Sequence, residues 1–376
     1  MPSNRRTFLA SAVVLASGVF AAACAPYPDA SIDPSVAYAV KQAKAARPAV
    51  TFPALSSSPV VTAAVASPST MTMMELQGTP VATNSGSSSP AGTPTPHQAM
   101  DPSLPPIAAG LTKEITFKTI DRNVEIAPKV TLAAWTFDGR IPGPFIRVRQ
   151  GDNVKFTLTN ASSMPHSIDF HSARTAPNVD YKSIAPGESY TFTWTAADPG
   201  VFLYHCGTAP MLQHLAEGMY GGVAVDAVST PLPKVDREFA FVQGEYYLTA
   251  PDANGVVRAD LQKANGGVPD EVVFNGYVNQ YMTQPIPVKV GEKIRVYLVN
   301  AGPNHFSAFH VVGTLFDHVW VDGNATNDLK GVQTWTVAPG EGSAFDFVLS
   351  KPGNYSMVTH SFADAGKGAM AVFKAE

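Results

Sequence analysis

One short stretch of the chain, residues 202–220, places a cysteine among residues that bind soft metals. The stretch reads FLYHCGTAPMLQHLAEGMY and contains Cys206, His214 and Met219. His166 lies upstream and adds a second imidazole. Two imidazoles, one thiolate and a weak thioether are the ligands of a blue-copper electron-transfer site. The sequence therefore predicts a copper site held by these four residues.

Cysteine usage supports a metal at Cys206. The chain has only two cysteines, and Cys24 lies in an amino-terminal region with the features of an export signal. An exported protein meets oxidising conditions, in which an unpaired thiol is exposed to oxidation. Ligation to a metal would protect the Cys206 thiol.

A second set of residues alternates with the first along the predicted strands. Successive side chains of a strand point to opposite faces. If Cys206 points into a sandwich of sheets, the adjacent His205 points out of it. By the same parity, an inward His166 leaves Asp169 and His171 facing outward. Two histidines are part of a catalytic metal site, which typically takes three protein ligands and keeps one position open. The second half of the chain offers four candidates for the third ligand: His305, His310, His318 and His360.

Short alternating runs from residue 107 onward indicate the strands that must position these ligands. Examples are KEITFKTI, IRVRQGDNVKFTLTN, SYTFTWTA and GVFLYH, separated by Pro-Gly, Gly-Asp and Asn-Ala breaks. Strands at this spacing predict an all-β sandwich or barrel. Cys206 would then end a strand, and His214 and Met219 would follow in a loop.

The strand pattern occurs twice. IAPGESYTFTW matches VAPGEGSAFDF, and DPGVFLYHC matches KPGNYSMVT, each 153 residues further along. Such self-similarity predicts a duplicated β domain. Prolines and polar residues near 226–236 mark the boundary. Thr359 takes the place of Cys206 in the second copy, which therefore lacks the soft-metal site.

The first 24 residues have the pattern of a signal peptide. Arg5 and Arg6 precede an uncharged run that ends at Ala23, and Cys24 follows. The twin arginines resemble a twin-arginine export motif, which is an address read by a receptor. The residues before Cys24 resemble a lipobox with Ala in place of the usual Leu, which predicts a lipidated Cys24; simple cleavage near Ala23 is the alternative.

Residues 25–104 are rich in Ala, Pro, Ser and Thr, a composition that predicts a disordered linker. Signal and linker together predict an exported protein, periplasmic or on the cell surface and anchored by lipid. The 26 Lys and Arg against 30 Asp and Glu give a net charge of −4, which offers no electrostatic reason to bind nucleic acid.

Four segments together resemble copper-containing nitrite reductases: MPHSIDFH, YHCGTAPMLQHLAEGMYG, SAFHVVGTLFDHVW and YSMVTHS. The resemblance covers roughly residues 104–376, with the eight-residue Cys-to-His spacing of the shorter-loop class. It implies a homotrimer whose subunits contain two tandem cupredoxin-like Greek-key β-sandwich domains. We place these domains at residues 105–230 and 231–376.

The resemblance also implies two coppers per subunit and the reduction of nitrite to nitric oxide. The type 1 copper, where the electron enters, is assigned to His166, Cys206, His214 and Met219. The type 2 copper, where nitrite binds, is assigned to His171 and His205 of one subunit and His360 of a neighbour. Asp169 and His310 fall where the family keeps its proton-donating pair. A separate protein, such as a cytochrome c or a small cupredoxin, is expected to donate the electron.

Two other functions are weighed against this one. The first is a two-domain laccase-like multicopper oxidase. The three-copper cluster of such an oxidase is typically bound by eight histidines, largely in His-x-His pairs, and this chain contains no such pair. A surface-tethered cupredoxin that only relays electrons has no need of His171, His205 and His360. The chain departs from the family pattern after His171 and after His360, where SARTAPNVD and SFADAGKGA stand. Nitrite specificity is therefore implied less closely than copper binding, and a copper oxidoreductase that acts on another small oxidant is a further alternative. No role is assigned to His305 and His318.

Overall fold

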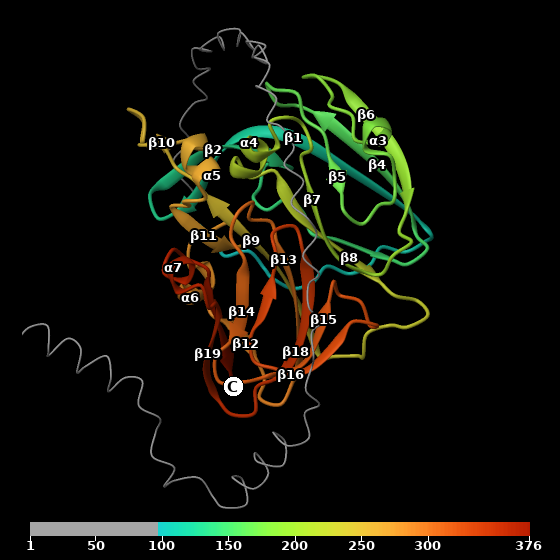
Figure 1. The fold of residues 1–376 in the computed structure, drawn as a ribbon, viewed down its shortest axis with the longest axis vertical. Helices are drawn as coiled ribbons and strands as arrows, with labels where there is room; N and C mark the ends of the chain where they lie inside the picture. Colours follow the sequence, from blue (N-terminus) through green and yellow to red (C-terminus); the bar gives the residue numbers. More distant parts are fainter. Residues whose placement is uncertain (1–96) are drawn as a thin grey trace, which may run out of the picture. The chain divides into compact units, whose positions relative to one another are not determined.

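The computed structural model describes residues 97–376 (Figure 1). The predicted signal peptide with Cys24, and residues 25–96 of the predicted linker, lie outside the described residues. Within residues 97–376, no helix has the length and apolar character needed to cross a membrane.

The first half of the described chain, joined by strand β10 from the second half, forms a sandwich of two sheets. A five-stranded sheet has the order β10-β2-β1-β4-β6, and a four-stranded sheet has the order β3-β8-β7-β5. The strands are β1 (Thr112–Ala127), β2 (Val130–Phe137), β3 (Ile146–Arg149), β4 (Asn153–Asn160), β5 (Asp169–Phe170), β6 (Ser189–Thr195), β7 (Gly200–His205), β8 (Tyr220–Asp226) and β10 (Val256–Val257). Two short helices, α3 (Pro177–Asp180) and α4 (Met211–Ala216), lie in its loops.

The second half forms another sandwich, coloured yellow to red in Figure 1. Its sheets have the orders β11-β9-β13-β18-β15-β16 and β12-β20-β19-β14-β17. The strands are β9 (Arg237–Tyr246), β11 (Glu271–Phe274), β12 (Ile286–Val288), β13 (Lys293–Asn300), β14 (Ser307–Val311), β15 (Phe316–Val321), β16 (Asp328–Val332), β17 (Trp335–Val337), β18 (Gly342–Val348), β19 (Gly353–Thr359) and β20 (Met370–Ala375). The helices are α5 (Leu261–Gly266), α6 (Gln280–Thr283) and α7 (Phe362–Ala365).

The two sandwiches repeat one topology. In the first, β1 runs parallel to β4 and β3 runs parallel to β8. In the second, β9 runs parallel to β13 and β12 runs parallel to β20. The antiparallel pair β7–β8 has its counterpart in β19–β20. The all-β, duplicated, cupredoxin-like fold expected from the sequence is thereby confirmed.

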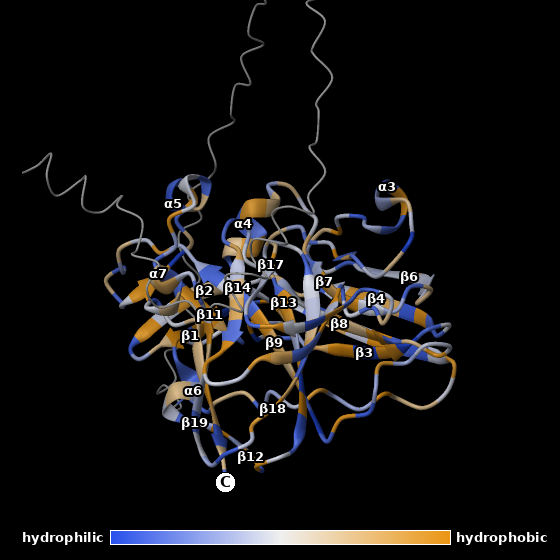
Figure 2. Ribbon diagram, turned by 60° about the horizontal axis from the view of Figure 1, so that its bottom comes forward, coloured by the Kyte–Doolittle hydropathy of each residue, from blue (hydrophilic) through white to orange (hydrophobic). Residues whose placement is uncertain are grey.

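Each sandwich encloses its own apolar core because its strands alternate between buried and exposed residues. In β4, Val154, Phe156 and Leu158 are buried while the residues between them face outward or lie part-way to the surface. Figure 2 shows this alternation as orange and blue stretches along single strands. The core of the first sandwich includes Cys206 and Met219. The predicted soft-metal ligands therefore lie at the edge of an apolar core.

The two sandwiches contact each other at β7, the strand that ends directly before Cys206. The Val201 amide donates to the Asp322 carbonyl at 2.8 Å, and Phe202 forms a β-bridge with Glu341. At Gly342 an added Cβ would lie 2.4 Å from the Val201 carbonyl oxygen, so only glycine permits this approach. The loop that precedes β18 is therefore held next to the beginning of β7.

Residues 97–104, which the sequence assigns to the linker, lie against the folded part of the chain. The ring of His97 stacks on Tyr277 with centroids 3.5 Å apart. The Tyr281 hydroxyl donates to the Met100 carbonyl at 3.0 Å, and Leu104 is buried in the core between the sandwiches. Composition alone does not reveal this segment, because its contacts are with residues far away in the sequence.

Candidate metal centres

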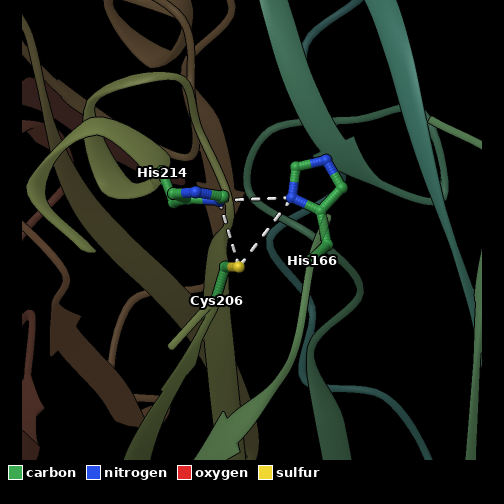
Figure 3. A group of neighbouring side chains, drawn as sticks. All are labelled: His166, Cys206 and His214. Atoms are coloured by element: carbon green, nitrogen blue, oxygen red, sulfur yellow. Dashed lines mark hydrogen bonds between the residues drawn. The ribbon is translucent and has the colours of Figure 1, made fainter. Parts of the chain in front are cut away.

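Three side chains converge in a buried cluster at the edge of the first sandwich (Figure 3). The Nδ1 atoms of His166 and His214 are 3.2 Å apart. The Sγ atom of Cys206 lies 3.1 Å from the His214 Nδ1 and 3.9 Å from the His166 Nδ1. A point equidistant from the three atoms lies about 2 Å from each, close to the length of a metal–ligand bond. We call these residues, with Met219, the first cluster.

Local structure brings three of these residues together. Strand β7 ends at His205, so Cys206 is the first residue beyond it. The chain then turns through α4, which carries His214, before β8 begins at Tyr220. The Cys206 amide donates to the Met219 carbonyl at 3.1 Å, which closes this loop. A single loop thus supplies a thiol, an imidazole and a thioether.

A chain of hydrogen bonds fixes which nitrogen of His166 faces the cluster. The Ser162 hydroxyl donates its one hydrogen to the Asp121 carboxylate, which can only accept. The Ser162 oxygen therefore accepts from the His166 Nε2, 2.8 Å away. With its hydrogen on Nε2, the neutral ring presents a bare Nδ1 to the cluster. Asp121 and Ser162 orient the ligand in this way.

Ser167 ties the two ligand-bearing loops together beside the sulfur. Its amide points at the Cys206 Sγ at 3.4 Å. Its hydroxyl oxygen accepts from the Gly207 amide at 3.0 Å and from the Thr208 hydroxyl at 3.1 Å. An amide donor aimed at sulfur favours the thiolate over the thiol. Ser167 therefore helps to prepare the form of Cys206 that binds metal.

Burial sets the protonation of the ligands. Desolvation, and then the neighbouring His214, lowers the pKa of His166 to about 4. Desolvation also lowers the pKa of His214 to about 4. Both imidazoles are therefore neutral near pH 7, as metal ligation requires. Burial raises the pKa of the Cys206 thiol, so a cation is needed to hold it as the thiolate.

A second cluster lies on the other side of the same peptide. The Nε2 atoms of His171 and His205 are 3.2 Å apart. The Nδ1 of His205 lies 2.9 Å from the Cys206 carbonyl, which can only accept, so it carries the hydrogen and leaves Nε2 bare. The Asp169 carboxylate lies within 4.8 Å of both ring nitrogens. We call Asp169, His171 and His205 the second cluster.

Strand pairing and the second sandwich position this cluster. Asp169 of β5 lies directly opposite His205 of β7. The side chain of His171 makes a hydrogen bond with the backbone of Gly340, which lies in the loop before β18. Desolvation, and then the nearby His205 ring, lowers the pKa of His171. The contact between the sandwiches therefore helps to orient one ring of the pair.

The second sandwich carries a separate pair of histidines. His310 lies on β14, and His360 directly follows β19, which pairs with β14. Their ring centroids are 5.0 Å apart, and His360 is exposed. Among the residues that the structure describes, neither joins the ligand atoms of the second cluster. Within one chain, the second cluster therefore has two histidines and a carboxylate.

Comparison with known proteins connects the two clusters to a family. Residues 119–229 and 237–374 match two multicopper oxidase families. A copper-containing nitrite reductase of Neisseria gonorrhoeae is 39% identical over 269 residues, which cover 70% of this chain and 68% of that protein. The chain belongs to the copper-containing nitrite reductase family. The family member from Alcaligenes xylosoxydans xylosoxydans is 30% identical over 302 residues, which cover 72% of this chain and 91% of that protein.

Solved structures of copper-containing nitrite reductases have the same fold. The enzyme from Nitrosomonas europaea at pH 8.5 superposes with a TM-score of 0.66 at 39% identity, over 70% of this chain and 94% of that one. The enzyme from Thermus scotoductus SA-01 gives a TM-score of 0.66 at 31% identity, over 70% of this chain and 62% of that one.

The donor atoms of both clusters fit the metal of the copper-containing nitrite reductases. The first cluster offers two neutral imidazoles and a soft sulfur, with a thioether in the same loop, a set that suits a blue copper site. It is buried, and within residues 97–376 no carboxylate joins its ligand atoms. The second cluster offers two imidazoles, one of them with a bare Nε2, beside a carboxylate, which suits a site with an open position.

Several residues around the clusters have no signal in the sequence. Asp121 and Ser162 are 41 residues apart, and neither belongs to a motif. Trp135 on β2 packs its ring 4.9 Å from that of His214 and 5.4 Å from that of His166. Gly340 comes from the other sandwich. Residue spacing could not reveal such positions, because the contacts join distant parts of the chain.

Proposed function

We infer that this chain reduces nitrite to nitric oxide and water, with copper at two sites. The observation that carries this function is the adjacency of His205 and Cys206, which places one residue in each cluster. The reaction takes one electron and two protons. When bound, copper in the first cluster passes on one electron, and copper in the second cluster binds nitrite as a Lewis acid.

We propose the following ligands. His166, Cys206, His214 and Met219 hold the type 1 copper. His171 and His205, with His360 of a neighbouring subunit, hold the type 2 copper. The peptide link between Cys206 and His205 gives the electron a covalent path from one cluster to the other.

Asp169 is proposed to form the proton-donating pair with His310 of the neighbouring subunit, the one that also supplies His360. The Asp169 carboxylate lies beside the ring nitrogens of His171 and His205, where a substrate bound in the second cluster would sit. The Nδ1 of His310 faces the Gln333 carbonyl, which accepts its hydrogen. Its Nε2 is therefore the atom that takes up and gives away a proton. Each of the two residues can supply one proton to the departing oxygen.

A homotrimer is proposed because one chain holds only part of the second site. The missing imidazole would come from His360, which is exposed next to Phe362. The side chain of Phe362 is 67% exposed. An exposed aromatic residue beside an exposed histidine is suited to contact with a second copy.

Export with a lipidated Cys24 and electron delivery by a cytochrome c or a small cupredoxin complete the proposal. Both rest on the sequence. Cys24→Ser should release the protein from the membrane fraction, and mass spectrometry of the wild type should find a lipid on Cys24. Recovery of both proteins in the soluble fraction would contradict the anchor and leave the enzymatic function untouched.

Copper counting with electron paramagnetic resonance (EPR) and nitrite titration tests the activity. The expected result is two coppers per chain, one blue and one whose signal changes with nitrite. One copper per chain and no nitrite-sensitive signal in the fully loaded protein would overturn the enzyme and favour a cupredoxin that only relays electrons.

Co-expression of two inactive variants tests the shared site. His205→Ala and His360→Ala should each lack type 2 copper when expressed alone. In trimers mixed at random from equal amounts, about one quarter of the interfaces would join an intact His205 to an intact His360. Recovery of about that share of type 2 copper supports the trimer. No recovery, in trimers verified as mixed, contradicts it.

A further inference from the structure

His305 lies in the loop between β13 and β14, and both of its ring nitrogens face acceptors. Its Nδ1 lies 3.0 Å from both carboxylate oxygens of Asp364. Its Nε2 lies 2.9 Å from the Gly267 carbonyl at the end of α5. A neutral imidazole has only one N–H, and an ionised carboxylate and a carbonyl can only accept. The contacts are therefore those of an imidazolium that donates from both nitrogens.

The backbone of the same loop is fixed to a second buried carboxylate. The His305 amide donates to Glu245 at 2.7 Å, and the Asn304 amide donates to the same oxygen at 3.4 Å. The Tyr247 hydroxyl donates to the other oxygen of Glu245. Glu245 is 1% exposed and Tyr247 is fully buried. The base from which the His305 ring extends is therefore rigid.

Asp364 connects His305 to the residue that follows His360. Asp364 is 2% exposed and lies in α7. One of its oxygens accepts from the Ser361 hydroxyl at 2.7 Å, and its amide donates to the Ser361 carbonyl at 2.8 Å. On the other side, the His360 amide donates to the Ala308 carbonyl at 2.7 Å. The backbone of His360 is thus held by β14 on one side and by Asp364, through Ser361, on the other.

We infer that His305, acting through Asp364, positions His360 for metal binding in the second site. The inference rests on the proposed role of His360 as a type 2 copper ligand. His360 is exposed, and among the contacts of the described residues its ring has only His310 and Phe362 as aromatic neighbours. The direction of its side chain therefore depends on how firmly its backbone is held. His305 and Asp364 are positioning residues, since neither reaches the ligand atoms.

His318 provides a matched control. Its Nδ1 lies 2.8 Å from the Asp328 carboxylate, and its side chain is 29% exposed, compared with 27% for His305. It lies on β15 and pairs with β16, away from α7. Each of the two histidines thus contacts one carboxylate through its Nδ1. Only the carboxylate partner of His305 is bonded to the residue next to His360.

The experiment compares His305→Gln, His318→Gln and His360→Ala in the full-length protein loaded with copper. Competition with a chelator measures type 2 copper affinity, EPR reports its coordination, and the blue absorption band reports folding of the first cluster. Loss of an outer partner of a metal ligand typically weakens metal binding by about 10- to 100-fold. We expect about tenfold weaker type 2 binding and an altered EPR signal for His305→Gln, with the blue band unchanged. His318→Gln should stay within about twofold of wild type.

Asp364→Asn should have the same effect as His305→Gln, and the double variant should be no weaker than the more affected single variant, because both act through one contact. If His305→Gln does not fold, Ser361→Ala decides the question, since it keeps the ion pair and removes only the hydroxyl link. Type 2 affinity of Ser361→Ala equal to wild type would then overturn the inference.

The outcomes separate the inference from the proposed function. If His360→Ala retains the type 2 signal, His360 is not a ligand and the proposed site is wrong. If His360→Ala loses that signal while His305→Gln matches His318→Gln, only the positioning role is wrong.

Discussion

The Nδ1 atom of His205 lies 2.9 Å from the backbone carbonyl oxygen of Cys206, so a hydrogen bond joins two residues that a peptide bond already links. The Cys206 sulfur faces the first cluster, and the His205 Nε2 faces the second. The hydrogen bond fixes the tautomer of His205 through a backbone oxygen that no side-chain substitution removes. The two clusters are therefore linked by a covalent path for electron transfer. The orientation of the His205 ring in the second cluster does not depend on the Cys206 side chain in the first.

Cys206→Ala should separate the two sites. Without the thiolate the first cluster loses its soft ligand, so we expect no blue absorption band. The Cys206 carbonyl remains, and His171 and His205 keep their orientation, so type 2 copper should still bind. Activity with a protein electron donor should be lost. Copper counting and EPR measure both sites. Loss of both coppers in a folded variant would contradict the independence of the clusters.

Ser162→Ala should disturb the first site through His166. The substitution leaves the His166 Nε2–H in a buried place without an acceptor, which costs about 1–3 kcal/mol. It also frees the ring to adopt the other tautomer. We expect type 1 copper binding weakened by about 10- to 100-fold, with a shifted blue band and potential.

Ser307→Ala is the control for that substitution. Ser307 is also fully buried, and its hydroxyl has no partner among the described residues. It should leave type 1 copper unchanged. Equal effects of the two serine substitutions would show that Ser162 has no particular role at the metal.

The sequence predicts the parts of the sites that depend on neighbouring positions. Cys206 and His214 share one loop, and strand alternation is enough to pair His171 with His205. The partners that orient these ligands come from other elements. Ser162 reaches Asp121, His171 reaches Gly340, and Trp135 packs on the rings from β2. Such contacts depend on how loops and sheets pack, which residue spacing does not encode.

His305 illustrates the same limit. A lone histidine in the sequence has no assigned role, because its partner Asp364 lies 59 residues away. The fold brings α7 next to the β13–β14 loop. The positive charge of His305 can be inferred only from the contacts with Asp364 and Gly267 that result.

Asp169→Asn should slow turnover while copper remains bound. The amide has nearly the shape of the carboxylate, so His205, which lies opposite it on β7, and the nearby His171 keep their places. It cannot hold and deliver a proton as the carboxyl group does. We expect kcat to fall by about 10²- to 10⁴-fold, the usual contribution of a general acid. Asp317→Asn, at an exposed position of β15, should leave kcat unchanged. Wild-type turnover in Asp169→Asn, with type 2 copper at full occupancy, would remove this residue from the proton path.

The ion pair of His305 makes the stability of the protein depend on pH. Burial opposes the positive charge, but the Gly267 carbonyl, Asp364 and Glu245 outweigh it and raise the pKa of His305 above its ordinary value of 6.5. A raised pKa means that the folded state binds the proton more tightly than the unfolded state. The stabilisation is therefore complete below the ordinary pKa and is lost as pH rises through the folded-state pKa.

His305→Gln should consequently destabilise the protein more at low pH than at high pH. Urea unfolding of wild type and variant, followed by circular dichroism at about pH 6 and about pH 9, measures the difference. We expect the loss in free energy of unfolding to be about 0.5–1 kcal/mol greater at the lower pH, the range of a partly exposed ion pair. Asp364→Asn should remove most of the same pH dependence, because the carboxylate is the main charged partner of the ring. A loss in His305→Gln that is equal at both pH values would mean that the ring is neutral and that its contacts with Asp364 and Gly267 do not require the imidazolium.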